Sequence, residues 1–147
     1  MKLFESILIA TDGSAKNKEA IEVGLNIARA YGSKVWAIYV IDTGLSSPIQ
    51  YSTALAGPGI PDVIMDLDDE AKQASDRVRA IAGDVPVTIV VREGKPAPEI
   101  IRFATEKKAD LIVIGSRGKG GFERLLLGSV ADEVVRAAHG NVLVVKG

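Results

Sequence analysis

Short apolar runs alternate with amphipathic segments along the whole chain, and this alternation limits its possible folds more than any other feature. The strand-like runs cover residues 6–10, 34–42, 85–93, 110–115 and 141–145. Between them the spacing predicts helices up to residue 31, over 61–82, within 94–109 and over 129–138. Such alternation predicts an α/β fold, a doubly wound parallel sheet of five strands with right-handed crossovers. The strands are almost continuously apolar, so we expect helices on both faces.

Two of the expected helices carry an apolar stripe on one side, as a helix packed against a sheet requires. In the first helix the stripe consists of Ala20, Ile21, Gly24, Ile27, Ala28 and Tyr31, and Gly32 is the expected stop. In the helix over 61–82 it consists of Ile64, Leu67, Ala71, Ala74, Val78 and Ile81. A chain of 147 residues has the length of one domain, so we expect a single domain over residues 1–147.

The composition excludes several kinds of functional site. The chain has no Cys and a single His, His139, which excludes disulfides, thiolate metal ligands, Cys nucleophiles and multi-His metal centres. Its net charge of -1 gives no general attraction to nucleic acids or acidic membranes. No apolar run reaches the roughly 20 residues that span a bilayer, and the N-terminus turns polar too early for a signal peptide. We therefore expect a cytoplasmic protein without nucleic-acid or membrane partners.

The loops that follow the expected strands are the candidate ligand-binding segments. In an open α/β sheet, ligands bind at the carboxyl ends of the strands, where the strand order reverses. The loops at that edge are TDGS at 11–14, IDTG at 41–44, REGKP at 92–96 and a glycine-rich stretch at 115–129. The order 3-2-1-4-5, which is typical of this fold type, would make the first and last of these loops neighbours.

The stretch GSRGKGGFERLLLGS over 115–129 contains five glycines but matches no familiar phosphate loop. A Walker A loop needs Lys where Gly121 stands, and a dinucleotide fingerprint needs Gly where Glu123 stands. Glycines still let backbone N–H groups approach an anion closely, and a helix that starts at Ser129 presents free N–H groups. Positive charge around the stretch comes from Arg117, Lys119 and Arg124.

A purely structural interpretation of the same stretch is also consistent with its residues. Ser129 and Asp132 form an S-x-x-D pattern, which is the signature of a helix capping box. Gly121 and Gly128 would then be ordinary turn residues. These residues alone leave phosphate binding and helix capping open.

The spacing of three glycines, however, resembles a family pattern. Gly115, two residues, Gly118, nine residues and then Gly128-Ser129 form G-2x-G-9x-G-[ST]. This pattern, with ILIATDGS near the start and GKPAPEII in the middle, resembles the nucleotide-binding branch of the universal stress protein family. The resemblance covers the whole chain and is most specific near its end, over residues 110–145.

The resemblance implies an adenine nucleotide alpha hydrolase-like fold that binds ATP, ADP or AMP. It assigns Asp12 to the ribose, with Ala10 and Thr11 bordering the nucleotide, and the backbone of Val40 to adenine. It assigns the phosphates to Gly115, Arg117, Gly118, Gly128, Ser129 and Val130. With ATP, a Mg²⁺ or Mn²⁺ ion would sit on the phosphates without protein ligands. The resemblance also implies a homodimer that pairs the final strand, Val142 to Val145, with its symmetry mate.

The residues themselves give independent reasons for two of these roles. The Asp12 carboxylate is a suitable acceptor for two sugar hydroxyls, although an Asx turn or a helix N-cap ahead of Ser14 explains it equally. An exposed apolar edge strand at 142–145 needs protection, which dimerisation or the nearby Lys146 would supply.

We therefore predict a stress-response protein that acts as an ATP-binding regulatory or sensor homodimer with a protein partner that the sequence does not identify. It contains no Walker B arrangement, its single His excludes an H-x-G-H signature, and ATDGSA departs from the S-G-G-x-D-S loop. We predict no catalytic residue and place His139 far from the site, at the end of the last helix. Two alternatives stay open: a slow ATPase or phosphoryl-transfer enzyme using the same pocket, and a nucleotide-free interaction dimer.

Overall fold

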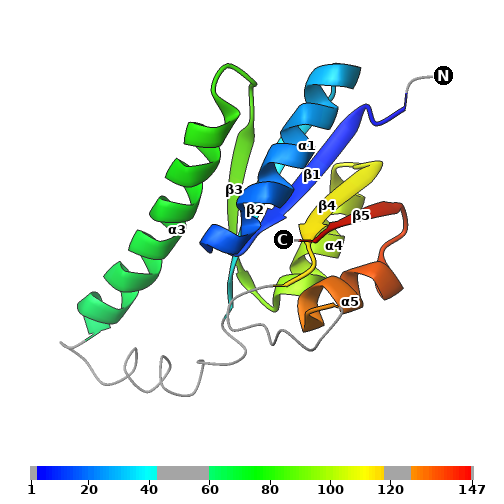
Figure 1. Cartoon of the computed structure of the whole chain (residues 1–147). Helices are drawn as coiled ribbons and strands as arrows, with labels where there is room; N and C mark the ends of the chain where they lie inside the picture. The colour runs from blue at the N-terminus through cyan, green and yellow to red at the C-terminus, as the bar shows by residue number, and fades with distance from the viewer. Residues whose placement is uncertain (1–2, 43–59, 118–126, 147) are drawn as a thin grey trace.

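The computed structural model describes residues 3–42, 60–117 and 127–146 of the chain, and these form an α/β fold around one sheet (Figure 1). The five strands are β1 (Ser6–Thr11), β2 (Lys34–Asp42), β3 (Thr88–Gly94), β4 (Leu111–Gly115) and β5 (Asn141–Val145). All neighbouring strands are parallel and lie in the order β3-β2-β1-β4-β5. The predicted fold class and strand order are therefore confirmed.

The pairing of β1 differs on its two sides. Toward β2 it extends over the whole strand, from Ser6↔Lys34 to Thr11↔Tyr39. Toward β4 it stops at Ile9↔Val113, two residues before β1 ends. Connections run in opposite directions from these two strands, so β1 and β4 flank the switch point of the sheet, and at their carboxyl ends they are not paired with each other.

The helices cover both faces of the sheet and bury an apolar layer against each. They are α1 (Lys18–Tyr31), α3 (Ile60–Ala82), α4 (Pro96–Glu106) and α5 (Ser129–Ala137), and a single 3-10 turn, η1 (Ala15–Asn17), precedes α1. One core layer joins α1 and the end of α3 to alternate residues of β1, including Ile7 and Ile9. The other joins α4 and α5 to the intervening residues, including Leu8 and Ala10.

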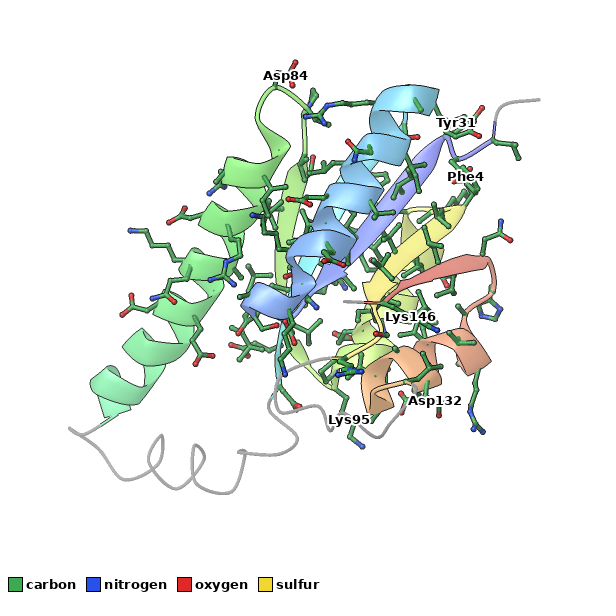
Figure 2. All side chains as sticks on the ribbon, in the orientation of Figure 1. Phe4, Tyr31, Asp84, Lys95, Asp132 and Lys146 are labelled. Carbon is green, nitrogen blue, oxygen red and sulfur yellow. The ribbon has the colours of Figure 1, made fainter. Side chains whose placement is uncertain are left out.

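The buried face of α1 matches the predicted stripe except at its end. Ala20, Ile21, Gly24 and Ala28 are buried, and Leu25 joins them. Tyr31 is 51% exposed, so its placement on the buried face is wrong. Its ring instead packs edge-on against Phe4, with centroids 5.4 Å apart (Figure 2). The helix ends, as expected, at Gly32, whose φ of 65° is the left-handed conformation that favours glycine.

One predicted strand begins later than its sequence indicates. The alternation at 85–93 predicted a strand from Val85, whereas β3 begins at Thr88. The Val85 N–H donates to the Ala82 carbonyl and so completes the end of α3. Pro86 has no N–H to give to a ladder, so pairing with β2 starts after it, at Trp36↔Thr88. No helix within the described ranges is long and apolar enough to cross a membrane.

Candidate functional site

The loop after β1 is held in one conformation by hydrogen bonds from its own side chains. The Asp12 Oδ1 atom accepts from the Ser14 N–H at 2.8 Å, which is an Asx turn. The Thr11 Oγ1 atom accepts from the Gly13 N–H at 3.1 Å. The local role that the sequence allowed for Asp12 is therefore confirmed as an Asx turn, and η1 has Ser14 at its N-cap, without a side-chain cap bond.

The second carboxylate oxygen of Asp12 takes no part in the hydrogen bonds of the loop. Asp12 Oδ2 is buried and has no hydrogen-bond partner among the described residues, and the same holds for Ser14 Oγ. Leaving a buried polar atom unpaired costs roughly 1–3 kcal/mol, and more for a charged group. An unpaired carboxylate oxygen at the carboxyl end of β1 is therefore suited to accept hydrogen bonds from a ligand.

A second layer of contacts fixes the loop from the side of α3. Gly13 has a φ of 79°, and a Cβ atom there would lie 3.3 Å from both the Ala74 Cβ and the Tyr39 ring. The Arg77 Nη1 atom donates to the Gly13 carbonyl at 2.6 Å. The turn that presents Asp12 is thus packed on α3 and on the end of β2.

Asn17 joins the two strands of the switch point, a role that we did not predict from the sequence. Its side chain is buried, with the residue only 4% exposed, and Oδ1 accepts from the Asp12 N–H at 2.6 Å. Its Nδ2 atom lies 2.8 Å from the position that a Cβ atom on Gly115 would occupy. The amide therefore contacts the loop after β1 on one side and the last residue of β4 on the other.

The two ends of the predicted phosphate stretch meet in space. The Gly128 N–H donates to the Ser116 carbonyl at 2.6 Å, and the Ser116 N–H donates to the Val145 carbonyl at 2.8 Å. These bonds place the start of α5 directly beside the end of β4. Gly118 lies outside the described residues, as do Lys119, Gly120, Gly121, Glu123 and Arg124.

The capping box that the S-x-x-D pattern allowed is not formed at the start of α5. Gly128 is the N-cap and Ser129 is already the first helical residue, so its hydroxyl makes no cap hydrogen bond. The Asp132 carboxylate instead accepts from Arg136 Nε, with the two oxygens 3.2 and 3.1 Å away. The first N–H groups of a helix have no acceptor within it, so those of Ser129 and Val130 are available at this end.

Three further predicted residues lie in the same region. Ala10 is 4% exposed and Val40 is half-buried, and both belong to the core layer beneath α4 and α5. Arg117 is half-buried, and within the described part of the chain its guanidinium has no hydrogen bond or ion pair. A positive charge without a partner, two residues after β4, is available to an anionic ligand.

Other features lie away from this edge of the sheet. His139 follows α5 at the opposite edge, as predicted, and lines a small hollow with Lys108 and Thr105. Among the residues that the structure describes, no three His, Asp or Glu side chains are grouped so that they could hold a metal ion.

Together the fold and the site define a doubly wound α/β protein whose polar groups converge on the switch point between β1 and β4. The family model described as "Universal stress protein family" matches residues 3–146. The chain therefore belongs to the universal stress protein family. It is 44% identical over 147 residues to Universal stress protein MJ0531 of Methanocaldococcus jannaschii, covering 98% of this chain and 83% of that protein.

Two solved structures extend the similarity to three dimensions. Protein MJ0577 of Methanocaldococcus jannaschii matches with a TM-score of 0.80 and 26% identity, over 98% of this chain and 96% of that chain. A universal stress protein in complex with cAMP matches with a TM-score of 0.66 and 28% identity, over 97% of both chains.

Proposed function

We propose that this chain binds an adenine nucleotide, with ATP as the principal ligand, at the carboxyl ends of β1, β2 and β4. In this proposal Asp12 binds the ribose, Ala10 and Thr11 border it, and the backbone of Val40 contacts adenine. Gly115, Arg117, Gly118, Gly128, Ser129 and Val130 surround the phosphates. The protein acts as a regulatory or sensor homodimer rather than as a dedicated enzyme.

The observation that carries the proposal is the unpaired Oδ2 atom of Asp12. Its carboxylate already uses Oδ1 in the Asx turn, and Oδ2 stays buried without a donor from any residue that the structure describes. A ribose supplies two adjacent hydroxyl donors, and hydrogen bonds to a charged acceptor are worth about 1.5–3 kcal/mol each. Ribose binding would therefore remove the cost of this unpaired oxygen.

The start of α5 supports the assignment of the phosphates. The Gly128–Ser116 hydrogen bond brings the free N–H groups of Ser129 and Val130 beside β4. Arg117, which has no partner in the described part of the chain, adds a positive charge two residues after that strand. An anion is stabilised by such an arrangement of dipoles and charge. Because the described residues offer no group of metal ligands, a Mg²⁺ or Mn²⁺ ion would be held mainly by the phosphates.

The relatives support the ligand class, since one similar universal stress protein has been solved in complex with cAMP. The final strand supports a homodimer. Among the described strands β5 pairs with β4 alone, and its apolar residues 142–145 are all half-buried rather than buried. An edge strand of this kind is stabilised by pairing with a second copy.

The decisive experiment compares ATP with 2′,3′-dideoxy-ATP in calorimetric titrations of the wild type and Asp12→Asn. Asn keeps the acceptor of the Asx turn and replaces Oδ2 by an amide nitrogen, so the loop should be preserved. We expect the wild type to favour ATP by about tenfold or more, and the variant to bind both ligands with similar, weak affinity. A wild type that does not distinguish the two ligands would contradict the role of Asp12.

Asp84→Asn is the matched control. The Asp84 side chain is 94% exposed and lies at the end of the molecule opposite Asp132, which belongs to the helix beside the site (Figure 2). It should leave both affinities unchanged. Following ATP turnover in the same samples separates a binding protein from a slow ATPase. Failure of the wild type to bind any adenine nucleotide would support a nucleotide-free interaction dimer instead.

A further inference from the structure

We infer that Asn17 is a ligand-binding residue of this site, and that its Nδ2 atom donates a hydrogen bond to the phosphate group nearest the ribose. The inference rests on the proposed nucleotide binding and names a residue outside the assigned glycine pattern. Asn17 is one of only four buried polar residues among those described, and it lies between the Asp12 loop and Gly115.

The orientation of the Asn17 amide is determined by its surroundings. The backbone N–H of Asp12 can only donate, so the atom 2.6 Å from it must be the amide oxygen. The nitrogen therefore faces the other way, toward the end of β4. Asn17 is only 4% exposed, and within the described part of the chain its Nδ2 atom makes no hydrogen bond. This atom is not among the fully enclosed unpaired atoms of the described residues, so its N–H groups are open to a ligand, and a phosphate oxygen would supply an acceptor.

Gly115 gives a second, independent observation. Its φ is not in the left-handed region, so its backbone conformation does not require glycine. What requires glycine is space, because a Cβ atom would lie 2.8 Å from Asn17 Nδ2 and 3.5 Å from the Arg117 carbonyl. Because Gly115, the first glycine of the G-2x-G-9x-G pattern, has no side chain, the Asn17 amide can lie at the end of the site where the phosphates are proposed to bind.

These two observations give different roles to the two ends of the Asn17 amide. Oδ1 of Asn17 positions Asp12, which serves the ribose, while Nδ2 points to the place where the phosphates begin. One side chain thus sets the spacing between the sugar end and the phosphate end of the ligand. A purely structural Asn17 would support the fold equally for ligands with and without phosphate.

The test measures affinities for ATP and adenosine in the wild type and in Asn17→Asp. Aspartate keeps the acceptor for the Asp12 N–H and has nearly the same size, but it replaces the donor by a carboxylate oxygen. We expect the ratio of ATP to adenosine affinity to fall by about tenfold or more. Asn26→Asp, an exposed Asn on α1, adds the same charge away from the site and should leave the ratio unchanged.

The outcomes separate this inference from the proposed function. A wild type that binds neither ligand overturns the proposed function itself. The wild type could bind ATP while Asn17→Asp lowers the affinities for ATP and adenosine equally, or lowers neither. That result overturns only the role of Asn17.

A second pair of variants tests the contact with Gly115 by thermal unfolding. Gly115→Ala should lower the melting temperature in the wild-type background, because the new methyl group meets the Asn17 amide. In an Asn17→Ala background the same substitution should have a much smaller effect, since the amide is absent. Equal effects in both backgrounds would show that Gly115 is required for a reason other than Asn17.

Discussion

At the scale of single residues, the candidate site depends on Gly13, where an added side chain would press against neighbouring residues. Gly13 adopts a φ of 79° directly after Asp12, and it faces Ala74 and the Tyr39 ring. Its carbonyl accepts from Arg77. Any distortion at this residue would be passed to the Asx turn, because Asp12 and Ser14 flank it. Conformation, packing and the proposed ligand binding are therefore combined in one short turn.

Gly13→Ala should destabilise the protein by about 2 kcal/mol, of which about 1 kcal/mol is the cost of a left-handed alanine. The remainder comes from the close contacts with Tyr39 and Ala74. Gly32→Ala is the matched control, since Gly32 has a φ of 65° but no atom within 4 Å of its would-be Cβ. Urea unfolding of both variants measures the difference. Equal losses would show that packing around Gly13 contributes nothing.

The sequence predicted part of this turn and not the rest. The Asx turn of Asp12 could be predicted because it depends only on neighbouring residues of TDGS, whereas the ribose role of Asp12 came from the family resemblance. Asn17 could not be assigned, because its contact with Gly115 joins positions that are far apart in the chain. An amide just before a helix is usually a cap. Asn17 is the N-cap residue of α1, but its side chain makes no cap hydrogen bond, and its Oδ1 atom accepts from the Asp12 N–H instead.

At the scale of helices and strands, the alternation of apolar runs was sufficient to predict every strand of the sheet. The errors lie where a boundary depends on hydrogen bonds rather than on periodicity. Strand β3 begins after Pro86, and the Tyr31 ring lies at the surface, where it packs against Phe4 instead of the core. The S-x-x-D pattern failed at α5 because the helix begins one residue earlier than a cap at Ser129 would require.

The two adjacent valines of α5 offer a matched test of how much the packing of this helix on the sheet contributes to the free energy of unfolding. Val134 is fully buried, whereas Val135 is 44% exposed. Val134→Ala should cost about 2 kcal/mol, from roughly 0.8 kcal/mol for each methyl group removed and a small cavity term. Val135→Ala should change the free energy of unfolding by less than about 0.5 kcal/mol. Denaturant titration of both variants checks this, and similar losses would contradict the packing of α5 on the sheet.

At the scale of the whole molecule, the sheet has two edges of different character. The edge strand β3 carries Arg92 and Glu93 among its last residues, while the other edge strand, β5, carries only apolar residues from Val142 to Val145. Charged residues discourage pairing between edges, and apolar ones do not. The asymmetry favours β5 as the strand of the proposed dimer interface.

Val144→Pro should separate the proposed dimer while leaving the fold intact. The Val145 carbonyl accepts from Ser116, so the backbone groups of residue 145 face the interior of the sheet and those of Val144 face outward. Proline at 144 removes an outward N–H without touching the ladder with β4. Sedimentation velocity should give a dimer for the wild type and a monomer for the variant. Val144→Ala, which keeps the N–H, should remain a dimer, and a monomeric wild type would refute the interface.

The central position of β1 also has a consequence for the order in which the chain can fold during synthesis. This strand is made first and finds one neighbour, β2, as soon as residue 42 has emerged, but its other neighbour is complete only at residue 115. Ribosomes add roughly 5–20 residues per second, so several seconds separate the two pairings. Until then one side of β1 lacks its partner, and Asn17 has no Gly115 to meet. The proposed nucleotide would accordingly bind only after β4 has been made, as a ligand that stabilises the pairing of β1 with β4 rather than one that starts the pairing of β1 with β2.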